Sequence, residues 1–166
     1  MKTRILFSLM LACAALTTKA GNEGAQAMPI APVKVLAEYI AAGGFFVPPG
    51  GVVSRRYQIL SNGDEQLITY TRDDKAPTTT LIKSLSPDEV AHVKDLVESI
   101  QPGDLVDANP GAPGCMDAPS FRHVVYPDAG EITIAEVFNC KKMDRPAATA
   151  ADAEIIDMLN DLAHQE

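Results

Sequence analysis

The residue types that most often do chemistry in proteins are few and scattered in this chain. Its three histidines are His92, His123 and His164, and none stands at i, i+4 spacing from another or beside a cysteine. Zinc sites need close ligand spacings, and a hydrolase would have to place its base on one of these histidines or on an unmarked lysine. A G-x-S-x-G elbow and a Ser-x-x-Lys at a helix start are both absent. We therefore assign no catalytic and no metal-binding residue, and expect a protein with neither enzymatic activity nor a cofactor.

One segment, the loop Asp104–Asp117, gathers side-chain oxygens and raises the question of calcium. Its oxygen-bearing side chains include Asp104, Asp107, Asn109 and Asp117. Calcium takes six to eight oxygen ligands, but the D-x-[DN]-x-[DN]-G register of a calcium loop is missing, and Pro110 and Pro113 interrupt the segment. We favour an acidic surface loop. The alternative is an envelope protein that binds calcium or a small ligand through this loop.

The cysteines predict one disulfide. Cys115 and Cys140 are the only cysteines after residue 13, and an even pair in an exported chain is most simply a disulfide. The bond would fasten the irregular Asp104–Pro119 segment to a β-hairpin, which stabilises the fold by about 3 kcal/mol in the chain-entropy model. The alternative is two free buried thiols.

The first 20 residues predict a secretory signal peptide. Lys2 and Arg4 precede the apolar run Ile5–Leu16, which only Ser8 interrupts. At about 1.5 Å per residue this run is too short to cross about 30 Å of hydrocarbon, so we expect no membrane span. Small residues around Ala20 then favour cleavage there and a secreted or periplasmic chain.

Two alternatives for the N-terminal region stay open. Cleavage after Ala27 also fits a small–x–small site, although it lies farther from the apolar run. The run Met10-Leu11-Ala12-Cys13 resembles a bacterial lipobox, in which the cysteine receives a lipid, but the usual leucine is replaced by Met10. We favour removal of Cys13 with the signal peptide; lipid anchoring in the cell envelope is the alternative.

Charge and length limit the classes of partner. The net charge of −8 becomes −11 once residues 1–20 are removed, since three basic residues and no acid are lost. Nucleic acid and anionic lipid would repel such a chain, so neither is expected as a partner. A flexible leader over residues 21–32 and a single domain over residues 33–166 account for the rest.

The elements that would position any site are strands with two helices. We expect strands at 33–40, 52–60, 66–71, 80–85, 121–126 and 132–138, with Asn62-Gly63 forming a hairpin turn. Ser86-Pro87-Asp88-Glu89 predicts a helix start with a capping box, and Thr149 predicts the cap of a last helix. The fold expected is α+β: an antiparallel sheet of about five to six strands with two helices on one face and one disulfide.

The segment Gly43–Gly51 is the candidate partner-binding loop. It comprises Gly43, Gly44, Phe45, Phe46, Val47, Pro48, Pro49, Gly50 and Gly51. An apolar tip that prolines stiffen loses little entropy on binding, which favours contact with a partner protein. The competing interpretation folds both phenylalanines inward as a plug under the sheet, because aromatics make up only 5% of the chain and a core needs large residues.

A resemblance adds to this interpretation. Gly43-Gly44-Phe45 at the end of a strand, followed by further strands, the helix Ser86–Ile100 and a β-hairpin, resembles the emfourin family of thermolysin-type metalloprotease inhibitors. With Val47-Pro48-Pro49 it is also similar to uncharacterised exported bacterial proteins that carry a G-G-F-V-P-P segment. The chain departs from both by inserting Phe46 and by adding the disulfide and the last helix. The resemblance implies a loop that occupies a protease cleft without being cut.

Overall fold

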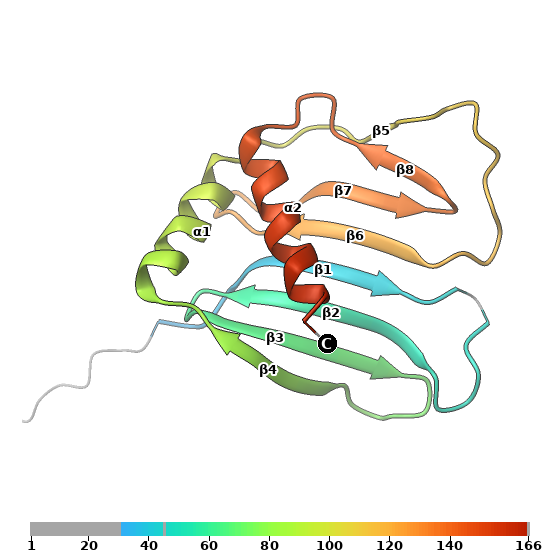
Figure 1. Cartoon of the computed structure of the whole chain (residues 1–166), viewed down its shortest axis with the longest axis horizontal. Coiled ribbons are helices and arrows are strands. Elements are labelled where there is room, and N and C mark those ends of the chain that lie inside the picture. The colour runs from blue at the N-terminus through green and yellow to red at the C-terminus, as the bar shows by residue number, and fades with distance from the viewer. Residues whose placement is uncertain (1–30, 45, 166) are drawn as a thin grey trace, which may run out of the picture. The chain divides into compact units, whose positions relative to one another are not determined.

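The computed structural model describes residues 31–44 and 46–165. Contacts divide the chain into Met1–Ala31 and Pro32–Glu166, and every described helix and strand lies in the second unit (Figure 1). The expected signal peptide, Cys13 and the leader up to residue 30 lie outside the described residues, as does Phe45.

The second unit is α+β, as expected, with an antiparallel sheet and two helices on one face of it (Figure 1). The strands run in the order β4-β3-β2-β1-β6-β7-β8-β5. In chain order the elements are β1 (Val35–Ala42), β2 (Val52–Leu60), β3 (Asp64–Thr71), β4 (Thr78–Ser84), α1 (Pro87–Ser99), β5 (Val106–Asp107), β6 (Ser120–Val125), β7 (Ile132–Phe138), β8 (Lys141–Asp144) and α2 (Ala150–Ala163).

The expected strand count was too low, because the sheet has eight strands. The six expected strands are present, with the first displaced to Val35–Ala42. The two that sequence reasoning missed are β8, which reads Lys-Lys-Met-Asp, and β5, which has only two residues. Neither carries the alternating apolar pattern by which a strand is recognised. Both lie at one edge of the sheet, and edge strands are often short and rich in charged side chains.

The helix caps follow the sequence closely. The Ser86 hydroxyl accepts the Glu89 N–H while the Glu89 carboxylate accepts the Ser86 N–H, so the capping box is formed. Thr149 and Asp152 form the equivalent box at the start of α2. Each box satisfies two backbone donors that a helix start leaves without an intrahelical partner.

The core lies between the helices and the central strands β2, β1 and β6. Ala37 of β1 faces Ile59 on one side and Val125 on the other, and all three are fully buried. The helices contribute buried residues at helical spacing, namely Val90, Val93 and Val97 from α1, with Ile155, Leu159 and Leu162 from α2. No helix in the described ranges is long and apolar enough to cross a membrane.

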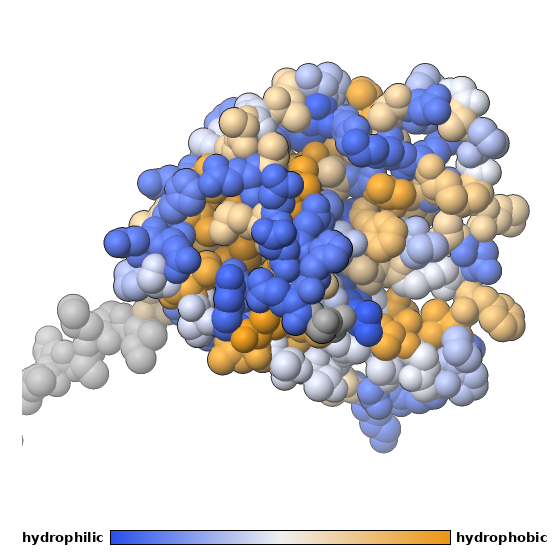
Figure 2. Space-filling view, viewed as in Figure 1, coloured by the Kyte–Doolittle hydropathy of each residue, from blue (hydrophilic) through white to orange (hydrophobic). Residues whose placement is uncertain are grey.

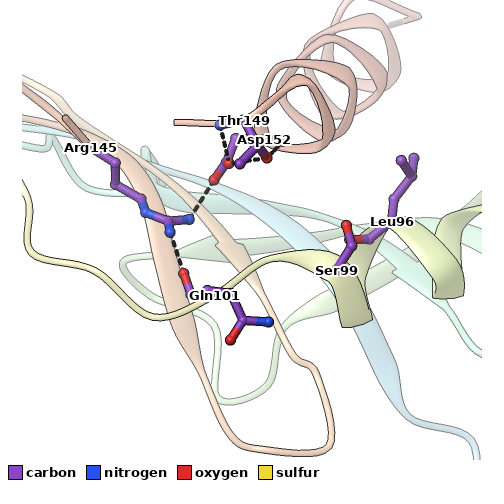
Figure 3. Close-up of polar contacts among 6 residues, drawn as sticks. All are labelled: Leu96, Ser99, Gln101, Arg145, Thr149 and Asp152. Atoms are coloured by element: carbon purple, nitrogen blue, oxygen red, sulfur yellow. Dashed lines mark hydrogen bonds and ion pairs between the residues drawn. The ribbon is translucent and has the colours of Figure 1, made fainter. Parts of the chain in front are cut away.

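A buried ion pair fixes the start of α2 against the chain that leaves α1 (Figure 3). The guanidinium of Arg145 donates to the Asp152 carboxylate and to the Gln101 carbonyl, and both charged side chains are at most 4% exposed. The other oxygen of Asp152 accepts the Thr149 N–H at 2.7 Å. One arginine therefore joins the last strand, α2 and the segment after α1.

Candidate functional site

Three connections meet at the end of the sheet that lies farthest from α1, at the right in Figure 1. They are the 43–51 loop between β1 and β2, the 108–119 segment before β6, and the turn 139–140 between β7 and β8. The first is the predicted binding loop, and the second overlaps the predicted acidic loop Asp104–Asp117. The structure brings them into direct contact.

The 43–51 loop is braced at its base. Gly51 donates a backbone hydrogen bond of 2.9 Å to the Pro48 carbonyl, which closes a tight turn. Gly50 takes φ +71° there, a left-handed conformation that glycine adopts without strain. The guanidinium of Arg72, in the connection between β3 and β4, donates to the Val47 carbonyl. The loop is therefore held by its own turn and by a neighbouring segment.

The same loop is joined to the 108–119 segment, here called the acidic segment, through Asp117. The Phe46 N–H donates to Oδ1 of Asp117 at 3.2 Å. Gly44 lies so close that a Cβ placed on it would be 2.4 Å from the Asp117 carbonyl oxygen. Gly43 continues the β1 pairing by donating to the Val53 carbonyl at 2.8 Å. Gly44 thus has a structural reason, because only a residue without a side chain allows this approach to Asp117.

The predicted disulfide is confirmed, and it fixes the acidic segment to the β7–β8 turn. Cys115 and Cys140 are bonded with their Cα atoms 5.5 Å apart. The Cys115 N–H also donates to the Asn139 carbonyl at 3.0 Å. Asn139 and Cys140 both take positive φ, 51° and 60°, as a two-residue hairpin turn requires. The three connections therefore form one cross-linked unit.

Large apolar side chains project from this unit into solvent. Phe46 is 90% exposed, Met116 94% and Phe138 53%. We call these three residues the apolar loop cluster. Phe138 lines both a hollow of about 200 Å³ with Gly43 and Gly44 and a hollow of about 460 Å³ that it shares with Met116. In Figure 2 hydrophobic surface is visible along this end of the sheet, including over the β1–β2 loop.

The exposure of Phe46 shows that the inward-folded plug, one of the two interpretations of the loop, is wrong for this residue. A side chain exposed to this degree is not a plug under the sheet, and the large residues of the core come instead from the strands and helices. Phe45 lies outside the described residues. Val47 is half-buried, while Pro48 and Pro49 are exposed. Met116 and Phe138 were missed by sequence reasoning; each stands beside the Cys115–Cys140 pair, which was the signal available to find them.

Two of the acidic side chains of the 104–117 segment, Asp107 and Asp117, have separate partners. Asp107 binds the Lys141 ammonium at 2.9 Å and accepts the Asn109 N–H, and these two contacts lower the pKa of its carboxyl group. Asp117 accepts the Phe46 N–H. Within residues 31–44 and 46–165, no group of three or more histidine, cysteine or acidic side chains is placed to hold a metal ion.

Two of the three histidines join α2 to other elements. His123 on β6 hydrogen-bonds the Asn160 amide oxygen of α2 at 3.0 Å, and burial lowers its pKa. His92 on α1 lies 2.6 Å from the Glu154 carboxylate of α2. His164 contacts the Asn160 carbonyl. His123 and His92 therefore join α2 to β6 and α1, whereas the contact of His164 lies at the end of α2 itself.

The face of the sheet away from the helices holds a buried carboxylate, Glu38, which is 2% exposed. One of its oxygens accepts from Gln58 at 2.8 Å, and the other accepts from the Tyr126 hydroxyl. Gln66 continues the ladder by donating to Gln58 at 2.9 Å. Burial, followed by the contact with Glu38, raises the pKa of Tyr126. Both carboxylate oxygens are satisfied internally, so this cluster is a structural polar network.

Comparison with known proteins adds no relative to this description. No protein-family model matches the chain, and neither a curated protein nor a solved structure matches it significantly.

Proposed function

We propose that this chain is an exported, non-enzymatic binding protein that contacts a partner protein through the apolar loop cluster. The observation that carries the proposal is the exposure of Phe46 and Met116 on two connections, and of Phe138 at the end of β7, at the place where a disulfide and the Asp117 contacts tie these segments together. Exposed apolar groups that gather on braced loops favour contact with another protein over solvation.

The energetics of such a surface suit protein binding. Covering a phenylalanine or methionine side chain contributes about 2 kcal/mol of association free energy. Because the loops are already cross-linked and turned, little chain entropy is lost when a partner covers them. A loop that folds only on binding would lose much of that gain.

The expected compartment and partner class follow from the sequence. The N-terminal pattern predicts export, and the Cys115–Cys140 disulfide supports an oxidising compartment such as the periplasm or the extracellular medium. The resemblance of Gly43-Gly44-Phe45 to the emfourin family makes a thermolysin-type metalloprotease the first partner to test. In this proposal the chain acts as an inhibitor-like module that presents the 43–51 loop.

The test combines binding and inhibition measurements on the purified mature chain. A thermolysin-type metalloprotease is titrated with the wild type, with Phe46→Ser and with Leu81→Ser. Residual peptidase activity is measured, and mass spectrometry reports whether the 43–51 loop has been cut. Leu81 is an exposed apolar residue on the edge strand β4, so its replacement is a matched control. We expect inhibition by the wild type and by Leu81→Ser, and inhibition at least tenfold weaker by Phe46→Ser.

A second arm covers partners other than this protease. The wild type and both variants are immobilised, and captured proteins from the culture supernatant of an exporting cell are compared. Capture that disappears only with Phe46→Ser supports the proposal with a different partner. Absence of inhibition together with identical capture by all three forms contradicts it.

A further inference from the structure

Another cavity lies at the other end of the sheet, between α1, the second half of α2 and the strands β3 and β4. Its volume is about 440 Å³. Four of its lining residues are acidic, namely Glu65, Asp88, Glu89 and Asp161, and Leu85 and Met158 supply apolar wall. In Figure 2 hydrophobic surface is visible in the region between the hydrophilic outer surfaces of the two helices. We call this cavity the acidic pocket.

Glu65 is the unusual member of the acidic pocket. The residue is only 3% exposed, and its Oε2 atom has no hydrogen-bond partner among the described residues. The nearest cation is the Lys83 ammonium, 3.4 Å away across the β3–β4 pairing. Burial raises the pKa of Glu65, and the Glu89 carboxylate adds to that effect while Lys83 opposes it. At 3.4 Å this ion pair is longer than the about 2.7–2.9 Å of a charge-assisted hydrogen bond, so Lys83 compensates the buried carboxylate only in part.

The charges around Glu65 select the kind of ligand. Four carboxylates line the cavity against the single ammonium of Lys83, so its field attracts cations. The described acidic side chains do not converge as a metal-binding group. Since Leu85 and Met158 supply apolar wall, the cavity suits a cation that carries an aliphatic chain.

We propose that the acidic pocket binds a primary alkylammonium group, with Glu65 as its buried carboxylate partner and Leu85 and Met158 against its aliphatic chain. Such a group belongs either to a free diamine or polyamine or to the side chain of a lysine residue in a peptide. The ligand ammonium takes the position beside Oε2 that Lys83 now approaches. Lys83 is about half exposed, so it can leave this position for solvent. The inference does not rest on the apolar loop cluster, which lies at the opposite end of the sheet.

Isothermal titration calorimetry at pH 8 and low ionic strength tests the inference. The intact mature chain is titrated with 1,5-diaminopentane in one arm and with a short peptide containing one lysine in the other. The arm that gives saturable one-site binding identifies the source of the ammonium group. Glu65→Gln should weaken that binding at least tenfold. Lys83→Met should tighten it several-fold, because the internal competitor is gone.

The control variant is Asp144→Asn, which removes one negative charge on β8, far from β3 in the strand order. Binding should be unchanged in this variant. Equal weakening by Asp144→Asn and Glu65→Gln would overturn the inference, because it would mean unspecific attraction to an acidic protein. Absence of saturable binding by the wild type in both arms would also overturn it. If Glu65→Gln does not fold, as thermal melting would report, the Lys83→Met comparison alone decides.

Discussion

The backbone N–H of Phe46 donates a hydrogen bond to Oδ1 of Asp117, 71 positions later in the chain. This contact joins the tip of the β1–β2 loop to the segment that carries Met116 and the disulfide. Asp117 itself takes φ +64°, a conformation that aspartate tolerates better than most residues. The orientation of the apolar loop cluster therefore depends on a contact between two connections, and the first prediction tests it.

Replacing Gly44 with alanine should displace the β1–β2 loop. The added Cβ would lie 2.4 Å from the Asp117 carbonyl oxygen, so the backbone of one loop must move. We expect a loss of about 1–3 kcal/mol in the free energy of unfolding, measured by urea denaturation, together with weaker partner binding. Gly111→Ala is the control, since a Cβ at Gly111 meets nothing within 4 Å. Equal stability of the two variants would contradict the account.

Removing the disulfide should destabilise the fold measurably. The double variant Cys115→Ser/Cys140→Ser opens a loop between residues 25 positions apart, which costs about 3 kcal/mol in the chain-entropy model. Urea denaturation of the variant and of the wild type in reducing agent should give the same lowered stability. Native wild-type protein should also fail to react with a thiol-alkylating reagent unless it is first reduced. Reaction of two thiols without reduction would contradict both the bond and the proposed compartment.

The buried ion pair between Arg145 and Asp152 should matter far more than an exposed one. Asp152→Ala leaves a buried guanidinium without its counter-ion and removes a cap of α2, so we expect a loss of about 3–5 kcal/mol. The control is Asp144→Ala, which breaks the exposed pair with Lys142 and should cost less than about 1 kcal/mol. Thermal and urea unfolding of both variants provide the comparison. A small effect of Asp152→Ala would mean that α2 is held by its apolar face alone.

His123 should make stability depend on pH. Burial lowers its pKa below the ordinary value of 6.5, so the unfolded chain takes up a proton more readily than the folded one. This contribution is complete above about pH 6.5 and is lost as the pH falls from there towards the lowered folded pKa. The free energy of unfolding should therefore fall more steeply between pH 7.5 and 5.5 for the wild type than for His123→Gln. Parallel curves would contradict this assignment.

The sequence predicted the local features well because their causes are local. Ser86 and Glu89 are three residues apart and form the capping box whatever the rest of the chain does. Asn62-Gly63 likewise encodes its turn, and Gly63 takes φ +94°. The Cys115–Cys140 bond was predictable because the expected compartment and the count of cysteines leave few alternatives.

The remaining features depend on partners that are distant in the sequence. Asn139-Cys140 forms the β7–β8 turn, but a cysteine at positive φ is not a turn signal, so β8 was missed. No spacing rule places Asp117 against Gly44, or makes Phe138 line hollows beside two different connections. Glu65 likewise has the sequence pattern of an ordinary hairpin residue, and the cavity that it lines is formed with residues of two helices that follow it in the chain.

Site-specific photo-cross-linking tests the central claim most directly. A benzophenone amino acid is placed at position 46, at position 116 or, as the control, at position 81, in the full-length chain expressed in its own cell. The account predicts the same cross-linked protein from positions 46 and 116 and no adduct from position 81. Adducts that form equally from all three positions, or from none, would contradict the assignment of the apolar loop cluster as the contact surface.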